Sequence, residues 1–312
     1  MTTAPTEISV LLPFNQAIDR VKRVLFQPFD LGKWCLIGFC AWLAQLGEQG
    51  LSFNFPSSSS SRRSGGNPGE ALEQARDFAV QNLWWLVPLV VTVVCFIIGL
   101  WLLFTWLNSR GKFMFLHCVA LDRAEVSAPW RQFSRQGNSL FLFRVILGLI
   151  SFLVTLPFLG LAALAVFSMV RHEAATVLGV LLLIALVLGL ILVAIVFFLV
   201  GKFTTDFVVP LMFLRSNSCL ESWKELLSLL RAQPGHFLLY LLFQLVLAIA
   251  IGAILLTLVL VTCCVAGCFM AIPYLGTVLL LPVLVFSRAY SLHYFAQYGQ
   301  PYDVFAPVAG NV

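Results

Sequence analysis

The chain has 312 residues, of which 60% are hydrophobic and only 11% are charged, and its mean hydropathy is +0.95. This composition excludes a water-soluble fold and indicates a membrane protein. The net charge of +5 comes from cations beside the apolar segments. Because no basic stripe interleaved with aromatic residues extends beyond these flanking segments, the charge does not predict a nucleic-acid partner.

The first patterned element is a basic, amphipathic segment that begins at Phe14 with the sequence FNQAIDRVKRVLFQPFDLGKW. Its apolar residues recur with helical spacing and its charged residues fill the other face. Such a helix is expected to lie at the membrane surface with its basic face toward anionic headgroups. Pro28 is expected to end this helix, and Asp30 to cap the next one.

Six apolar segments come next along the chain. Each reaches or nearly reaches the length of about 20 residues that a helix needs to cross the hydrocarbon core. They lie at 31–47, 83–108, 139–169, 175–200, 237–265 and 272–296. The first is the shortest and closes with a polar run. Residues 56–69, between the first two segments, are rich in Ser and Gly and are expected to form a disordered loop on the non-cytoplasmic side.

The same order of elements recurs three times, over approximately 14–122, 127–216 and 218–298. Each repeat has an amphipathic segment, two apolar runs and a related exit: GKFMFLHCVA from Gly111, GKFTTDFVVP from Gly201 and SRAYSLHYFA from Ser287. In the third repeat, Ser218 and Glu221 have capping-box spacing. The pattern predicts an all-α integral membrane protein with six transmembrane helices. Three helix hairpins, each preceded by a cytoplasmic interfacial helix, are expected to stack into one bundle.

The distribution of Lys and Arg predicts the topology. Fifteen of the 19 cations fall on one set of alternate connections, and the other side receives only Arg62, Arg63, Arg76 and Arg171. Because cations resist translocation, both termini are expected in the cytoplasm. The expected location is the cell membrane, with the bacterial inner membrane as the best match.

Three cations occupy equivalent positions, where the second helix of each repeat meets the cytoplasmic boundary: Lys112, Lys202 and Arg288. If the repeats pack around a pseudo-threefold axis, these cations converge into a ring that holds a lipid phosphate or passes an anion. The alternative, which the sequence favours, is that each side chain snorkels separately to headgroups, as interfacial cations commonly do.

Three further polar residues lie within or beside apolar segments. Asp206 follows Lys202 by one helical turn, so an ion pair with Lys202 or another cation is expected, with proton coupling as the weaker alternative. Arg144 and Gln244 are expected to face other helices, because a lipid-facing Arg or Gln is unfavourable. The alternative is that Arg144 and Gln244 line a permeation path.

The sequence predicts no metal or cofactor and no enzyme. His117 and His293 occupy related positions, but no Cys or carboxylate pattern completes a metal site, so both are interpreted as interfacial histidines. Cys263, Cys264 and Cys268 are interpreted as small buried residues, with an outer-face disulfide as the alternative. No motif for nucleophilic or acid-base catalysis is present.

The stretch LFQPFDLGKWCLIGFCAWLA, from Leu25 to Ala44, and the three-hairpin order resemble uncharacterised multi-pass prokaryotic membrane families. These families are related to the membrane domain of glycerophosphoryl diester phosphodiesterase, whose catalytic domain has no counterpart here. The expected function is a non-enzymatic membrane protein that binds lipids or organises partners, either copies of itself or other membrane proteins. The alternative is a small-solute or ion transporter or channel along the pseudo-threefold axis.

Overall fold

The computed structural model describes residues 9–47, 82–171, 177–262, 267, 269–270 and 272–306, which form helices and no strand. The all-α expectation is therefore confirmed over these residues. The helices are α1 (Leu12–Val21), η1 (Lys22–Phe26), α2 (Leu31–Gln45), α4 (Leu83–Leu121), α5 (Ser127–Gln132), α6 (Ser134–Arg171), α7 (Val177–Phe203), η2 (Thr204–Val208), α8 (Val209–Arg215), α9 (Cys219–Ala232), α10 (Pro234–Val261), α12 (Pro273–Leu279), α13 (Leu281–Ala296) and η3 (Gln300–Tyr302). The 56–69 loop and the cluster Cys263, Cys264 and Cys268 lie outside the described residues.

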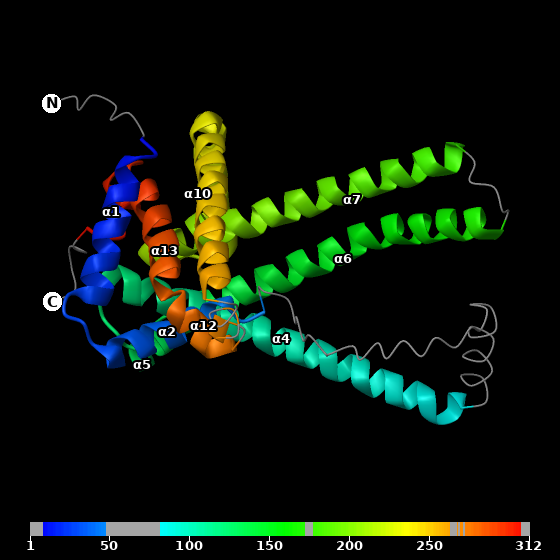
Figure 1. Cartoon of the computed structure of the whole chain (residues 1–312), viewed down its shortest axis with the longest axis horizontal. Helices are drawn as coiled ribbons and strands as arrows, with labels where there is room; N and C mark the ends of the chain where they lie inside the picture. The colour runs from blue at the N-terminus through cyan, green and yellow to red at the C-terminus, as the bar shows by residue number, and fades with distance from the viewer. Residues whose placement is uncertain are drawn as a thin grey trace.

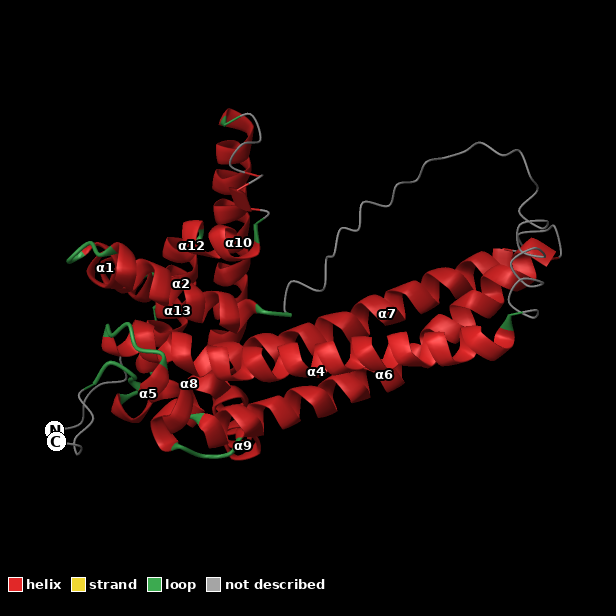
Figure 2. Ribbon diagram, turned by 90° about the horizontal axis from the view of Figure 1, so that it is seen from below, coloured by secondary structure: helices red, strands yellow, loops and turns green. Residues whose placement is uncertain are grey.

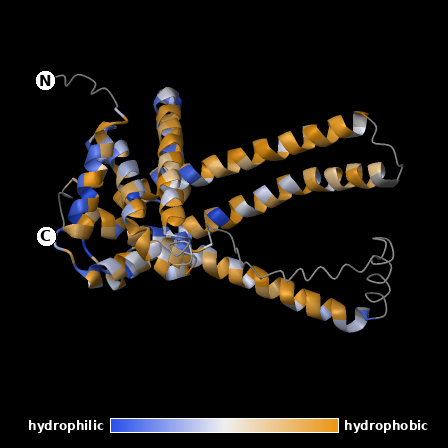
Figure 3. Cartoon of the chain, viewed as in Figure 1, coloured by the Kyte–Doolittle hydropathy of each residue, from blue (hydrophilic) through white to orange (hydrophobic). Residues whose placement is uncertain are grey.

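Four of the described helices are long and apolar enough to cross a membrane: Trp84–Leu121, Ser134–Met169, Gly179–Arg215 and Pro234–Val261. Almost no residue of their most apolar stretches is buried, and Figure 3 colours most of each of these helices as hydrophobic. An exposed apolar surface of this extent is compatible with lipid and not with water. The protein is therefore a helical membrane protein.

The other two expected segments differ from full-length spanning helices. The segment 31–47 forms α2, which has only 15 residues. The segment 272–296 is broken into α12 and α13, with Pro282 just after the break. Proline has no amide hydrogen to continue the helical bonds, which accounts for an interruption there. Much of α13 is also buried, so this helix belongs to the protein core rather than to a lipid-facing surface.

The long helices do not form the single bundle that the repeats predicted. Helices α4, α6 and α7 leave the core in one general direction, whereas α10 leaves it in another (Figures 1 and 2). Helices α6 and α7 pack as the expected hairpin, and the ring of Phe158 lies directly against Gly189. Away from the core, α4 diverges from this pair (Figure 1). A helix that is apolar on every face does not specify which helix it packs against. The apolar pattern therefore predicted the helices but not their packing.

The core forms where the inner ends of the long helices meet α1, α2, α8 and α13. Phe207 of η2 packs there against Tyr240 of α10 and against Phe295 of α13, with ring centroids 5.0 and 5.4 Å apart. On the α2 side, Gly111 brings the backbones of α4 and α2 into contact, since a Cβ at this position would lie 2.6 Å from the Ala44 amide nitrogen. The core is therefore a meeting point of helix ends.

The local signals behaved as predicted at two helix starts. The carboxylate of Asp30 accepts a hydrogen bond from the amide of Gly32 and caps α2. Ser218 and Glu221 form both bonds of the capping box at α9. These bonds satisfy amide groups that have no partner within the helix.

The two ends of the described chain lie together. The amide of Ser9 donates to Oε1 of Gln297, and Nε2 of Gln297 donates to the carbonyl of Ser9, both at 2.8 Å. The hydroxyl of Tyr290 also donates to the carbonyl of Val10. This contact holds the start of the described chain beside the end of α13.

A cation-lined cavity as the candidate functional site

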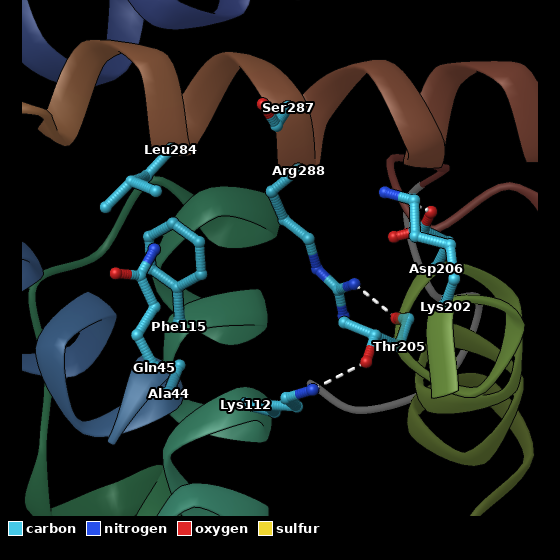
Figure 4. Close-up of a pocket in the computed structure, with 10 residues that line it drawn as sticks. All are labelled: Ala44, Gln45, Lys112, Phe115, Lys202, Thr205, Asp206, Leu284, Ser287 and Arg288. Carbon is cyan, nitrogen blue, oxygen red and sulfur yellow. Dashed lines mark hydrogen bonds and ion pairs between the residues drawn. The ribbon is translucent and has the colours of Figure 1, made fainter. Parts of the chain in front are cut away.

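A cavity of about 230 Å³ lies where α2, α4, α7, η2 and α13 meet (Figure 4). The lining residues are Ala44, Gln45, Lys112, Phe115, Lys202, Thr205, Asp206, Leu284, Ser287 and Arg288. All three of the equivalent cations noted in the sequence are among them. The structure thus brings Lys112, Lys202 and Arg288 to one site.

The three cations reach the cavity from different helices and differ in burial. Lys112 of α4 and Arg288 of α13 are 4% and 7% exposed. The side chain of Lys202, at the end of α7, is 29% exposed. Snorkelling to separate headgroups requires an exposed charged end, so that interpretation does not describe Lys112 or Arg288.

Thr205 is the residue on which the surrounding cations converge. Lys112 Nζ donates to Thr205 Oγ1 at 2.5 Å, and Arg144 Nη2 approaches the same oxygen at 3.5 Å. Arg288 Nη1 donates to the backbone carbonyl of Thr205. Figure 4 shows Lys112 and Arg288 pointing toward this residue from opposite sides. One threonine therefore links α4, α6 and α13 to the end of α7.

Local helix geometry explains why the Thr205 carbonyl accepts from a side chain. Thr204–Val208 forms a π-helical turn, and the amide of Val209 donates to the carbonyl of Thr204. The next amide along would belong to Pro210, which has no amide hydrogen. The carbonyl of Thr205 is left for a donor outside its own helix, and Arg288 provides it. Single π turns within longer helices are frequent at functional sites.

Asp206, the next residue, belongs to a closed ring of polar contacts. Its carboxylate lies 2.9 Å from Lys202 Nζ, which confirms the ion pair expected from their spacing. The hydroxyl of Tyr240 donates to the same carboxylate at 2.9 Å, and Gln244 Nε2 donates to that hydroxyl at 3.0 Å. Lys202 Nζ closes the ring by donating to Gln244 Oε1 at 3.3 Å. Gln244 therefore faces the protein, as predicted.

Arg144 also faces the protein and connects the cavity to α2. It donates to Oδ1 of Asn108 on α4. Nδ2 of Asn108 in turn donates to the carbonyls of Ala44 and Leu46, at 2.6 and 2.9 Å. Because carbonyls at a helix end have no partner within the helix, this amide fixes the end of α2 beside the cavity.

No sequence pattern predicted a role for Thr205, Asn108 or Tyr240. Thr205 lies between Lys202 and Asp206 in a polar stretch of the second exit, and Asn108 precedes Lys112 by one helical turn. Both spacings place these residues near a cation that was already identified. Tyr240 gave no comparable signal, because an aromatic residue in an apolar segment ordinarily belongs to the core.

The lining of the cavity combines charged and apolar side chains. Lys202 and Asp206 lie on one side of Arg288, and Phe115 and Leu284 lie on the other side, together with the amide of Gln45 (Figure 4). Three cations and one carboxylate leave a surplus of positive charge among the lining residues. The chemistry that fits is an anion attached to an uncharged or apolar body.

His117 and His293 do not line this cavity, and neither do the cysteines within the described residues. His117 packs against the rings of Phe133 and Phe213, and His293 stacks on Phe305. Among the described residues, no group of three His, Cys, Asp or Glu side chains is placed to hold a metal ion. Cys40 and Cys118 are free thiols whose sulfur atoms lie 3.9 Å apart in the interface of α2 and α4.

Residues 10–299 match the family of unknown function DUF7544, and the chain therefore belongs to this family. No curated protein and no solved structure is significantly similar to the chain. The resemblance to the membrane domain of glycerophosphoryl diester phosphodiesterase stays a prediction, because the matching family has no assigned activity.

Proposed function

We propose that this protein is a non-enzymatic, multi-pass membrane protein that binds an anionic ligand, foremost the phosphate group of a lipid, in the cation-lined cavity. The observation that carries the proposal is the meeting of Lys112, Lys202 and Arg288, from three different helices, at one cavity. The proposal includes the topology expected from the cation distribution, with six crossings, three repeats and both termini in the cytoplasm.

The charges of the site support an anionic ligand. Arg and Lys bind phosphate through charge-assisted hydrogen bonds, which are about twice as strong as neutral ones. Burial of Lys112 and Arg288 places these charges where water screens them less. An anion in the cavity would offset the cost of keeping these cations away from water.

The apolar side of the cavity favours a lipid over a free inorganic anion. Phe115 and Leu284 would contact the uncharged part of the ligand while the cations hold its phosphate. The neighbouring long helices expose apolar surface to the bilayer, so lipids surround the site at high local concentration. These features support lipid binding as the main role.

Lipid analysis of purified protein tests the proposal. The variant K112Q/K202Q/R288Q removes the three cavity cations. Its control, R123Q/K224Q/R231Q, removes three exposed cations that lie neither in the cavity nor on the first amphipathic helix. Both proteins and the wild type would be purified in the same detergent, and bound lipids quantified by mass spectrometry. We expect anionic lipid to be lost from the cavity variant and kept by the control. Equal amounts of anionic lipid in all three proteins would contradict the proposal.

A transporter or channel is the second candidate, and one observation favours it. Arg144 and Gln244, both within candidate spanning helices, contact Thr205 and Lys202 of the cavity lining. Flux of labelled phosphate and of chloride into proteoliposomes would separate the two functions. Lipid binding without flux supports the first proposal, and flux that the cavity variant abolishes supports transport.

A further inference from the structure

The hydroxyl of Thr205 occupies the point at which two cations meet. Lys112 Nζ donates to Thr205 Oγ1 at 2.5 Å, and Arg144 Nη2 approaches it at 3.5 Å. These donors come from α4 and α6, and Thr205 itself follows α7. A single neutral oxygen thus receives donors that are suited to an anionic oxygen.

The two oxygens of Thr205 have different roles. The carbonyl needs Arg288, because Pro210 offers no amide hydrogen to it. The hydroxyl has a second bond, as a donor to the carbonyl of Gly201 at 3.1 Å. The hydroxyl can therefore give up Lys112 and still keep a partner, whereas the carbonyl would lose a needed donor if Arg288 left.

We propose that the Thr205 hydroxyl competes with the ligand for Lys112, and that a tetrahedral oxyanion of the phosphate class binds by taking over this bond. This inference rests on the proposed anion-binding function. Arg288 keeps the Thr205 carbonyl and also faces the anion, since a guanidinium carries five N–H donors. Lys112 has three N–H donors, so the competition is for the position of its ammonium group, which the 2.5 Å bond holds at Thr205 Oγ1. When the group moves to the anion, it exchanges a neutral acceptor for an anionic one, which strengthens its bond. Thr205 thus lowers the affinity of the site for the anion, although it does not contact the bound anion.

The substitution Thr205→Val isolates this competition. Valine preserves the branched shape and the backbone carbonyl and removes only the hydroxyl. Thr204→Val is the matched control, because the hydroxyl of the buried Thr204 donates to the carbonyl of Val200 in its own helix and does not contact a cavity cation. Thr205→Ser, which keeps the hydroxyl, is a second control.

The proteins would be placed in phosphatidylcholine nanodiscs and titrated by calorimetry in two arms, with short-chain phosphatidic acid and with inorganic phosphate. We expect T205V to bind the phosphate group about tenfold more tightly than wild type, the gain of one charge-assisted hydrogen bond without a competitor. T204V and T205S should bind like wild type, and T205V/K112Q should lose the gain. A gain confined to the phosphatidic acid arm identifies a lipid ligand, whereas a gain in both arms identifies the free oxyanion as sufficient.

Two results overturn the inference, and they are distinguishable. If wild type binds a probe and T205V binds it equally or more weakly, the competition is wrong and the anion site stands. If wild type binds neither probe, both the proposed function and the inference that rests on it are wrong. Should T205V not fold, a phosphate-bound structure of the wild type decides. Lys112 Nζ bonded to the phosphate supports the exchange, and Lys112 Nζ still bonded to Thr205 Oγ1 refutes it.

Discussion

Arg144 of α6 donates a hydrogen bond to Asn108 of α4, and the amide of the same asparagine holds the end of α2. Three helices from distant parts of the sequence are thereby joined through one buried side chain, since Asn108 is almost fully buried. Because an unpaired buried polar group costs about 1–3 kcal/mol, this residue is a sensitive point of the fold.

Replacing Asn108 with leucine should lower the stability of the protein by about 2 kcal/mol. The substitution keeps the side-chain size but leaves the Arg144 donor and the two α2 carbonyls without Asn108. Thermal unfolding in detergent measures the change. Asn138→Leu is the control, because Asn138 is exposed and accepts longer bonds from Trp106 and Arg110. An Asn108 variant as stable as the Asn138 variant would show that the α2 connection is not needed.

The Lys202–Asp206 ion pair should be strongly coupled. Removing one member of a buried pair leaves an uncompensated charge and costs about 3–5 kcal/mol, and the partial exposure of Lys202 reduces this to about 2–3 kcal/mol for D206N. The double variant D206N/K202M should be less destabilised than the sum of the single variants. A double-mutant cycle on thermal stability measures the difference, and strictly additive effects would contradict direct coupling.

Gly111 and Gly201 each begin a Gly-Lys-Phe stretch and should respond differently to alanine. A Cβ at Gly111 would collide with the backbone of α2, whereas a Cβ at Gly201 would meet no atom within 4 Å. We therefore expect G111A to destabilise the protein by about 1–3 kcal/mol and G201A to be neutral or slightly stabilising. Unfolding midpoints of the two variants provide the comparison. Equal midpoints would mean that α2 can move away from α4 without loss.

Cys219 should be unreactive at neutral and mildly alkaline pH. Burial at the start of α9 raises the pKa of this thiol to about 12, so the nucleophilic thiolate forms only in strongly alkaline solution. Alkylation with iodoacetamide at pH 8, followed by peptide mass spectrometry, measures its reactivity. Full modification in denaturant is the reference for the same residue. Rapid modification of Cys219 in the native protein would indicate that α9 separates readily from the core.

Local features of this fold could be predicted from short sequence patterns. The caps at Asp30 and Ser218 depend on residues within one helical turn, and so does the pairing of Lys202 with Asp206. Such interactions are fixed by helical geometry before any helix meets another. The all-α membrane class followed from composition alone.

Long-range features could not be predicted in the same way. The divergence of α4 from α6 depends on packing, which apolar periodicity does not specify. The related sequences at 111–120, 201–210 and 287–296 did indicate Lys112, Lys202 and Arg288 as a set, but not that Lys112 and Arg288 would share Thr205 as a partner. That contact depends on a π turn and on Pro210, and no spacing rule places a π turn in advance.

The π turn at Thr204–Val208 also determines which way the side chains of α8 point around the helix axis. A turn closed by i to i+5 bonds contains one residue more than an α turn, and each residue of an α-helix advances the chain by about 1.5 Å and 100°. If the same residues were wound as a regular α-helix, the extra residue would turn the fully buried Leu211 and Met212 by about 100°, away from the core, although every side chain of the cavity would still be encoded. The site therefore depends on the number of residues in this stretch as much as on their chemistry.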